Sequence, residues 1–183
     1  ECKKLAEKLD APVCNGYQHN DSFPGSHPLA VGPLGYNGSK AAMELISKAD
    51  VVLALGTRLN PFSTLPGYGI DYWPKNATII QVDMNPDRIG LTKKVTVGIC
   101  GDAKQVAQQI LDKLSSDAGN LGRDERKNLI HKTKSAWLQT LAGLDHEEDD
   151  PGTVWNKEAR ERDKDRMSPR QAWRAIQDAI PKD

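Results

Sequence analysis

Short apolar runs and periodic apolar stretches alternate along the first 115 residues. The apolar run at residues 51–55 is continuous, which predicts a strand with both faces covered, and residues 78–82 and 94–100 predict two further strands. Apolar positions spaced three or four residues apart predict helices at 39–49 and 103–114, which begin beside a serine and an aspartate suited to capping. Because strands alternate with helices, we predict the α/β class, with a parallel sheet flanked by helices.

The start of the chain predicts a helix without a strand before it. An apolar face marks this helix, which ends at residues 10–12, and residues 12–14 predict a short strand. Since a βαβ domain normally begins with a strand, we expect at least one strand before Glu1 in a longer parent protein. Residues 15–38 contain three prolines and five glycines without apolar periodicity, so we expect a long ordered loop there.

The composition changes after position 115. An amphipathic helix is predicted at 123–144, and residues 145–166, with nine acidic and five basic side chains, are expected to wrap a surface or to be mobile. A last helix begins at Ser168-Pro169 and has an apolar face with nothing in this chain to pack against. The predicted organisation is a central α/β domain lacking its first strand (1–115), a charged linker with an amphipathic helix (116–166) and the first helix of a truncated further domain (167–183).

Composition excludes several classes of protein. The 25 basic and 25 acidic residues give a formal net charge of zero, whereas nucleic-acid binders usually carry a basic excess. No apolar run approaches the length of a membrane span, so we expect no membrane partner. The three cysteines are far apart and odd in number, which argues against a disulfide framework and favours the reducing cytoplasm. Without a Cys/His cluster we expect no metal site in the chain.

The central domain also contains a series of short motifs. In chain order they are Phe23-Pro24 with His27-Pro28-Leu29, the glycines Gly32, Gly35 and Gly38, Ala49-Asp50-Val51-Val52-Leu53, Gly56-Thr57-Arg58, Ile80-Gln81-Val82-Asp83-Met84-Asn85-Pro86, Ile89-Gly90 and Gly101-Asp102-Ala103. Together they resemble the central domain of the thiamine-diphosphate-dependent enzymes related to acetohydroxyacid synthase. The resemblance implies a Rossmann-like domain in a parent enzyme that uses thiamine diphosphate and Mg²⁺.

Two longer segments, residues 16–21 and 60–74, resemble the acyl-transferring members of that family, as do the charged linker and residues 168–172. Those members convert sulfoacetaldehyde and phosphate to acetyl phosphate and sulfite. The glutamate and the Gly-Asp-Gly…Asn segment with which the family activates and holds its cofactor have no match here. The resemblance therefore implies a mainly structural fragment, inactive alone, with no catalytic residue of its own. Its expected partners are the remaining domains of the same polypeptide, within a homo-oligomer.

Candidate nucleotide contacts follow the predicted strands, at the ligand-binding edge of an open parallel sheet. Gly56 and Arg58 follow one strand, and in flavin- or ADP-binding relatives the matching arginine contacts the nucleotide. Otherwise Arg58 is a surface residue that pairs with a carboxylate. Asp83 either accepts hydrogen bonds from ribose hydroxyls or caps the turn after it. Asp102 either accepts hydrogen bonds from ribose hydroxyls or caps the following helix.

A second candidate region is the loop with glycines at 32, 35 and 38, which in relatives lies near the active site. Tyr36 and Asn37 either reach the substrate or belong to a structural loop. His19 is a weak candidate for contact with a sulfonate, which needs arginine, lysine or backbone N–H donors, and no cluster of these is visible. The alternative function is a nucleotide-binding module, for FAD or ADP, of a related enzyme such as acetohydroxyacid synthase or oxalyl-coenzyme A decarboxylase.

Overall fold

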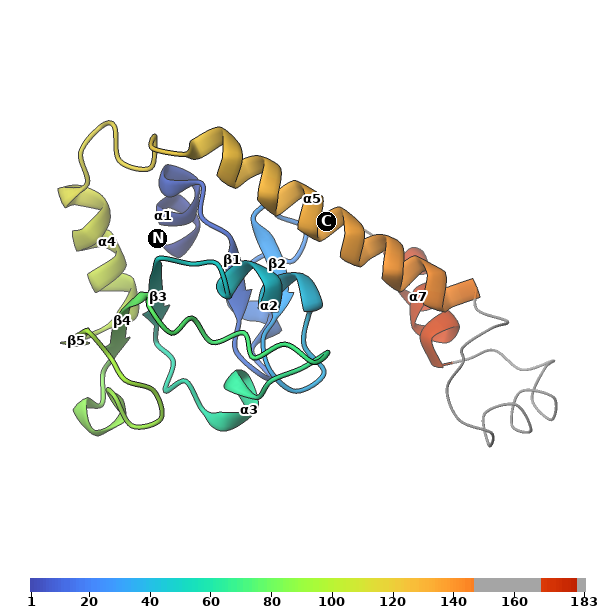
Figure 1. Ribbon diagram of the computed structural model, residues 1–183, viewed down its shortest axis with the longest axis horizontal. Helices are drawn as coiled ribbons and strands as arrows, with labels where there is room; N and C mark the ends of the chain where they lie inside the picture. Colours follow the sequence, from blue (N-terminus) through green and yellow to red (C-terminus); the bar gives the residue numbers. More distant parts are fainter. Residues whose placement is uncertain (147–168, 181–183) are drawn as a thin grey trace. The chain divides into compact units, whose positions relative to one another are not determined.

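The computed structural model describes residues 1–146 and 169–180, which form two compact units, Glu1–Trp137 and Leu138–Asp183. The strands of the first unit are β1 (Val13–Asn15), β2 (Ala30–Pro33), β3 (Val51–Leu55), β4 (Thr78–Asp83) and β5 (Val97–Cys100) (Figure 1). Its helices are α1 (Cys2–Leu9), α2 (Lys40–Ile46), α3 (Pro61–Thr64) and α4 (Ala103–Lys113), with the 3-10 helices η1 (Asn20–Ser22) and η2 (Pro86–Arg88). The boundary between the units falls inside α5 (Arg123–His146), and the second unit also contains α7 (Pro169–Ala179).

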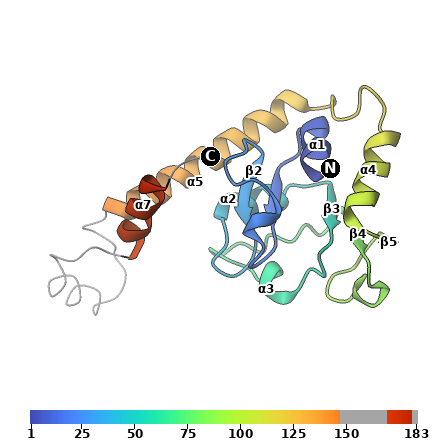
Figure 2. The same cartoon turned by 180° about the vertical axis from the view of Figure 1, so that it is seen from behind.

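All the strands pair in parallel, which confirms the α/β class, but they form two sheets. One sheet contains β1 and β2, and the other has the order β3-β4-β5 (Figure 2). No ladder joins β1 to β3 among the residues that the structure describes. The prediction that residues 51–55 form a strand buried on both faces is wrong for most of β3, in which Ala54 is the one buried residue and Val51 is 53% exposed.

The prediction of a long loop at residues 15–38 is wrong in one respect, because this segment contains the short elements η1 and β2. Strand β2 pairs with β1 through Val13 and Ala30, with a shift of register before Cys14. It covers only four residues and ends in Gly32-Pro33, so it has neither the length nor the apolar pattern that predicts a strand. Strand β5 also begins later than predicted, at Val97.

Side chains at the start of the helices account for where these helices begin. The Ser39 hydroxyl accepts from the N–H of Ala42 over 3.3 Å at the start of α2, as predicted. The short helix α3, which was not predicted, begins with Asn60 as its cap and Pro61 at its first turn, a combination that favours helix initiation.

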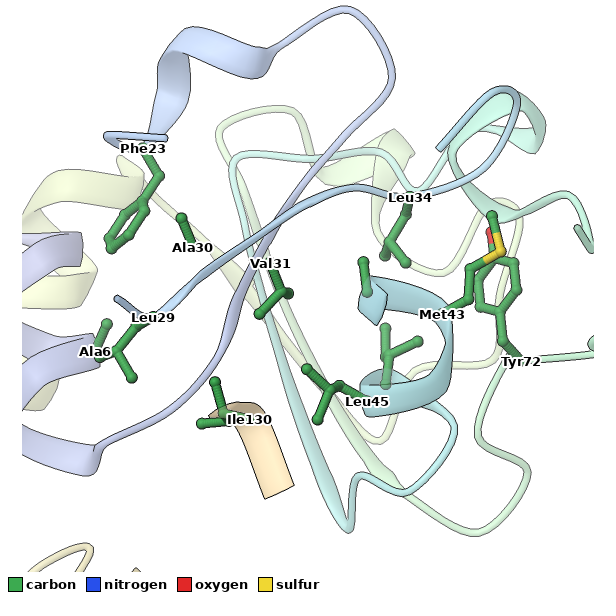
Figure 3. Close-up of a cluster of buried hydrophobic side chains, with 12 residues drawn as sticks. Ala6, Phe23, Leu29, Ala30, Val31, Leu34, Met43, Leu45, Tyr72 and Ile130 are labelled. Carbon is green, nitrogen blue, oxygen red and sulfur yellow. The ribbon is translucent and has the colours of Figure 1, made fainter. Parts of the chain in front are cut away.

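The main core lies between the two-stranded sheet and the helices around it (Figure 3). Helix α2 contributes four side chains to this core, and five of its seven residues are buried. Ile130 of α5 also joins this core, so the part of the predicted amphipathic helix that belongs to the first unit packs within that unit. The buried members are Ala6, Phe23, Leu29, Ala30, Val31, Leu34, Ala42, Met43, Leu45, Ile46, Tyr72 and Ile130.

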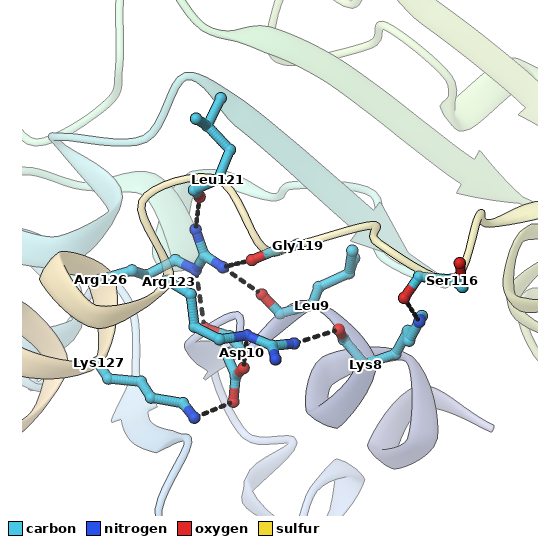
Figure 4. Close-up of polar contacts among 9 residues, drawn as sticks. All are labelled: Lys8, Leu9, Asp10, Ser116, Gly119, Leu121, Arg123, Arg126 and Lys127. Atoms are coloured by element: carbon cyan, nitrogen blue, oxygen red, sulfur yellow. Dashed lines mark hydrogen bonds and ion pairs between the residues drawn. The ribbon is translucent and has the colours of Figure 1, made fainter.

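Polar contacts tie the start of α5 to the end of α1 (Figure 4). Asp10, which ends α1 in the left-handed conformation, forms ion pairs with Arg123 and Lys127, at 2.7 Å from Arg123 Nε and 3.5 Å from Lys127 Nζ. The guanidinium of Arg126 donates to the carbonyls of Leu9 and Asp10 over 2.8 and 3.1 Å. These bonds satisfy carbonyls that the end of α1 would otherwise leave without a partner.

The predicted final helix is present as α7. Its Trp173 and Ile176 are exposed within the second unit, as expected of an apolar face without a partner there. Residues 147–168, which include most of the predicted charged segment, lie outside the described part of the chain. None of the described helices has both the length and the apolar character needed to cross a bilayer.

Candidate functional site

The predicted binding residues lie where β3, β4 and β5 end, along one edge of the three-stranded sheet. The N–H of Gly56, the first residue after β3, donates to the carbonyl of Val82 over 2.8 Å. On the other side of β4, the Gly101 N–H donates to the carbonyl of Asp83 over 3.1 Å. The structure therefore brings Gly56 and Asp83 close to the start of α4, where Asp102 lies.

Both carboxylates at this edge make local hydrogen bonds. Oδ1 of the buried Asp83 accepts from the N–H of Asn85 over 2.9 Å. Oδ1 of the exposed Asp102 accepts from the N–H of Gln105 over 2.9 Å and so caps α4. The structure thus contains the capping hydrogen bonds that were one of the two alternatives for each residue. Contact of either residue with a nucleotide stays a prediction.

Gln81, in the middle of β4, determines the geometry of the two loops at this edge. Its buried amide donates to the carbonyl of Thr57 over 2.9 Å and to that of Arg88 over 3.0 Å. Its Oε1 accepts from the N–H of Gly90 over 2.9 Å. The analysis of the sequence missed this residue, although a glutamine within an otherwise apolar run is a visible signal that a buried amide has a specific partner.

Arg58 lies on the first of these loops with its side chain exposed. Its carbonyl accepts from the hydroxyl of Thr92, so its backbone is fixed. The guanidinium forms no ion pair with a carboxylate among the described residues, unlike the expected surface pair. Arg88, also exposed, lies on the second loop. The two arginines thus occupy loops that one glutamine joins, and guanidinium groups suit phosphate or sulfonate oxygens.

Tyr36 and Asn37 belong to a different cluster, near the ends of β1 and β2. The ring of Tyr17 stacks on that of Phe62 with centroids 5.5 Å apart, and it meets the edge of Tyr36 at 6.1 Å. We call Tyr17, Tyr36 and Phe62 the aromatic pad. Asn37 is exposed and has a φ of 52°, in the left-handed region. The pad was not predicted, because no spacing in the sequence connects its three rings.

A rigid backbone framework holds the aromatic pad. The N–H of Tyr36 donates to the carbonyl of Phe62 over 2.8 Å, and the N–H of Tyr17 donates to the buried Ser63 hydroxyl over 2.9 Å. The Tyr72 hydroxyl donates to the carbonyl of Ser63 over 3.1 Å. Gly35, with a φ of 82°, lies so close to α3 that an added Cβ would meet the carbonyl oxygen of Phe62. The three segments that carry Tyr17, Tyr36 and Phe62 are thus joined to one another by hydrogen bonds and close backbone contact.

The histidines do not add a catalytic group to either cluster. His27 lies 3.1 Å from a Glu7 oxygen and accepts from the N–H of Leu29, so it is a hydrogen-bonded loop residue. His19 is exposed, and no ring contact or side-chain bond joins it to the aromatic pad within the described residues. In the same part of the chain, no three His, Cys, Asp or Glu side chains come together in a way that could hold a metal ion.

Cys14, beside the core, offers a test of how tightly this region is packed. Burial raises the pKa of the Cys14 thiol to about 12, from 9.0. Because only the thiolate reacts, we expect a thiol reagent at pH 8 to modify folded Cys14 about a thousandfold more slowly than the same residue in urea. Mass spectrometry of timed samples measures both rates, with the exposed Cys100 as a control that reacts in the folded chain. Equal rates for Cys14 in both states would contradict the packing described.

Comparisons with known proteins agree with the fold. A family model for "Thiamine pyrophosphate enzyme, central domain" matches residues 1–110. A "Probable sulfoacetaldehyde acetyltransferase" of Rhizobium meliloti is 78% identical over 183 residues, which are 100% of this chain and 31% of that protein. A "Sulfoacetaldehyde acetyltransferase" of Roseovarius nubinhibens is 74% identical over 180 residues, 98% of this chain and 30% of its own length.

A relative with lower identity has a different name. The "Probable acetolactate synthase large subunit" of Methanocaldococcus jannaschii is 34% identical over 144 residues, which cover 79% of this chain. In each of these comparisons the chain spans less than a third of the relative, with 22% for the acetolactate synthase subunit.

Proposed function

Because the chain belongs to the thiamine pyrophosphate enzymes, as part of their central domain, we propose that its full-length parent converts sulfoacetaldehyde and phosphate to acetyl phosphate and sulfite. The observation that carries this proposal is the 78% identity, over all 183 residues, to a relative of that name. The match covers the segments 16–21, which contains Tyr17 of the aromatic pad, and 60–74, which contains helix α3. The chain itself acts in this proposal as a scaffold of the enzyme.

The residues of this chain do not fit a diphosphate and metal site. The Gly101-Asp102-Ala103 turn resembles part of such a site in sequence alone, because in the structure the Asp102 carboxylate caps α4. Among the described residues, Asp102 belongs to no group of three or more His, Cys, Asp or Glu side chains that could hold a metal ion. We therefore propose that thiamine diphosphate and Mg²⁺ bind to other domains of the parent, and that this chain alone is inactive.

Sulfite release is the test of this proposal. The full-length parent, loaded with thiamine diphosphate and Mg²⁺, is expected to release sulfite from sulfoacetaldehyde in a phosphate-dependent reaction and to leave pyruvate unchanged. The same assay on the chain alone is expected to give only the rate without enzyme. Turnover of pyruvate, without turnover of sulfoacetaldehyde, would overturn the proposal in favour of an acetolactate synthase activity.

A second candidate function is nucleotide binding at the carboxyl edge of the three-stranded sheet. The exposed guanidinium of Arg58, on a fixed backbone and without a carboxylate partner in the described part, favours it. Calorimetric titration of the full-length parent with FAD, ADP and coenzyme A tests it. We expect Arg58→Gln to weaken binding about tenfold or more, since a charge-assisted hydrogen bond contributes about 1.5–3 kcal/mol. Lys113→Gln, at the end of α4, is the control, and silence with all three ligands would remove this candidate.

The cellular setting is also part of the proposal. We propose a cytoplasmic homo-oligomer in which the remaining domains of the same polypeptide complete each active site. The location is supported by Cys2, Cys14 and Cys100, which are all free thiols. The presence of further domains is supported by the share of the relatives that the chain spans, 31% and 30%.

A further inference from the structure

The dipeptide Asn-Gly occurs twice in the chain, and the structure gives its two copies opposite surroundings. Asn15-Gly16 lies at the end of β1, whereas Asn37-Gly38 lies in the turn between β2 and α2. In such a dipeptide the backbone nitrogen of the glycine can attack the asparagine side chain, because glycine has no Cβ to hinder the approach. We propose that Asn37 is a site of spontaneous deamidation, and that the fold protects Asn15 from the same reaction.

The proposed reaction consumes only water. The backbone nitrogen of Gly38 forms a bond to Cγ of Asn37, the bond from Cγ to the side-chain nitrogen breaks, and a succinimide ring remains. The side-chain nitrogen leaves as ammonia, with the proton that the Gly38 nitrogen loses. Water then opens the ring at either of its carbonyl carbons and gives aspartate or isoaspartate. The net change exchanges ammonia for water and leaves a new carboxylate at position 37.

The side chain of Asn37 is accessible to this reaction. It is exposed, and no hydrogen bond holds it within the part of the chain that the structure describes. The attacking nitrogen is restrained by one bond, since the Gly38 N–H donates to the carbonyl of Gly35 over 2.9 Å and closes the turn. Turns at the surface open locally at a small cost in free energy, so this bond slows the attack without preventing it.

The turn itself requires both residues of the reactive pair. Asn37 is the third residue of the turn and has a φ of 52°, which asparagine and glycine tolerate far better than most residues. At Gly38 an added Cβ would lie 2.6 Å from the carbonyl oxygen of Pro33 and 2.8 Å from the carbonyl carbon of Leu34. A larger residue after Asn37, which would slow the attack, is therefore excluded by the close packing of the turn.

Asn15 has the same neighbour in sequence but a protected side chain. It is 6% exposed, and its Nδ2 donates to the hydroxyl of Ser22 over 2.8 Å and to the carbonyl of His19 over 3.2 Å. Its own carbonyl accepts from the N–H of Leu34 over 2.9 Å. Attack on Cγ of Asn15 would require the side chain to give up both of its hydrogen bonds, so folding should slow the reaction here.

Ageing of the 183-residue chain at pH 8, followed by mass spectrometry of its peptides, tests the proposal. In the folded chain we expect Asn37 to deamidate at least about tenfold faster than Asn15, because two side-chain hydrogen bonds protect Asn15. In guanidinium chloride both dipeptides lose their surroundings, and their rates should agree within about threefold. Slow reaction of Cys14 with a thiol reagent confirms that the aged sample is folded. Equal rates in the folded chain, or an unmodified Asn37 there, would overturn the proposal.

The variant Asn37→Gly gives an independent measurement. Glycine keeps the positive φ and removes the reactive amide. Isoaspartate, in contrast, adds a carbon atom to the backbone of a turn that has no space for one, so ageing should lower the melting temperature of the unsubstituted chain by about 4 °C. The melting temperature of Asn37→Gly is expected to stay unchanged over the same period. An equal loss in both chains would place the damage elsewhere and contradict the proposal. Neither experiment uses turnover, so their failure would leave the proposed reaction of the parent standing.

Discussion

Replacing Gly35 by alanine is expected to lower the free energy of unfolding of the chain by about 4 kcal/mol or more, the range reached when a substitution forces the backbone to move. Two effects add. A residue with a Cβ is disfavoured at a φ of 82°, by about 1–2 kcal/mol. The new Cβ would also meet the carbonyl oxygen of Phe62 and lie 2.7 Å from Ser63 Cα, so α3 would have to shift. Urea unfolding followed by tryptophan fluorescence measures the change.

The loss should be specific to this position. Gly25→Ala is the matched control, because an added Cβ there has no neighbour within 4 Å and the backbone is not in the left-handed region. We expect the control to change the free energy of unfolding by less than about 0.5 kcal/mol. If both variants unfold at the same urea concentration, the close approach of Gly35 to α3 is wrong.

Replacing Gln81 by methionine is expected to cost about 3 kcal/mol of unfolding free energy. Methionine has nearly the same length, so the loss comes from hydrogen bonding and not from a cavity. The carbonyls of Thr57 and Arg88 and the N–H of Gly90 would each lose a partner, and an unsatisfied buried group costs about 1–3 kcal/mol. Three such groups would cost about 3–9 kcal/mol in total, and the expected loss lies near the lower end of that range because solvent reaches part of these loops.

Hydrogen exchange separates this effect from general destabilisation. The Gly90 amide, which donates to Gln81 Oε1, should exchange faster in Gln81→Met by a larger factor than amides in the core helix α2. Gln109→Met, on the exposed surface of α4, is the control and is expected to change stability by less than about 0.5 kcal/mol. Unchanged exchange at Gly90 in Gln81→Met would show that the glutamine does not hold the loop.

The regular elements could be predicted wherever the local pattern was long enough. The apolar run at 51–55 and the helical spacing after Asp102 gave β3 and α4 nearly to the residue, since burial and capping act locally. Strand β2 and helix α3 have four residues each, which is too short for periodicity to show. Only pairing with β1 reveals β2, and that contact lies 17 positions away, between Val13 and Ala30.

The carboxyl edge of the three-stranded sheet and the aromatic pad also differ in how far the sequence predicts them. The carboxyl edge with Gly56, Asp83 and Asp102 was predictable because parallel strands end on one side of a sheet. The aromatic pad was not, since it depends on a bond between Tyr17 and Ser63, which are 46 positions apart. The importance of Gln81 could have been inferred from its place in an apolar strand, but its partners could not, because they belong to loops without regular structure.

The division of the strands between two sheets has a practical consequence for work with this region alone. A single five-stranded sheet would have two outer strands, whereas here β1, β2, β3 and β5 each present an unpaired edge among the described residues. Such edges template the addition of strands from neighbouring molecules, and the exposed Val51 on β3 adds an apolar contact. Stock solutions of the isolated region should therefore grow turbid faster with rising concentration than those of the full-length parent. Dilute storage and short handling times suit it best.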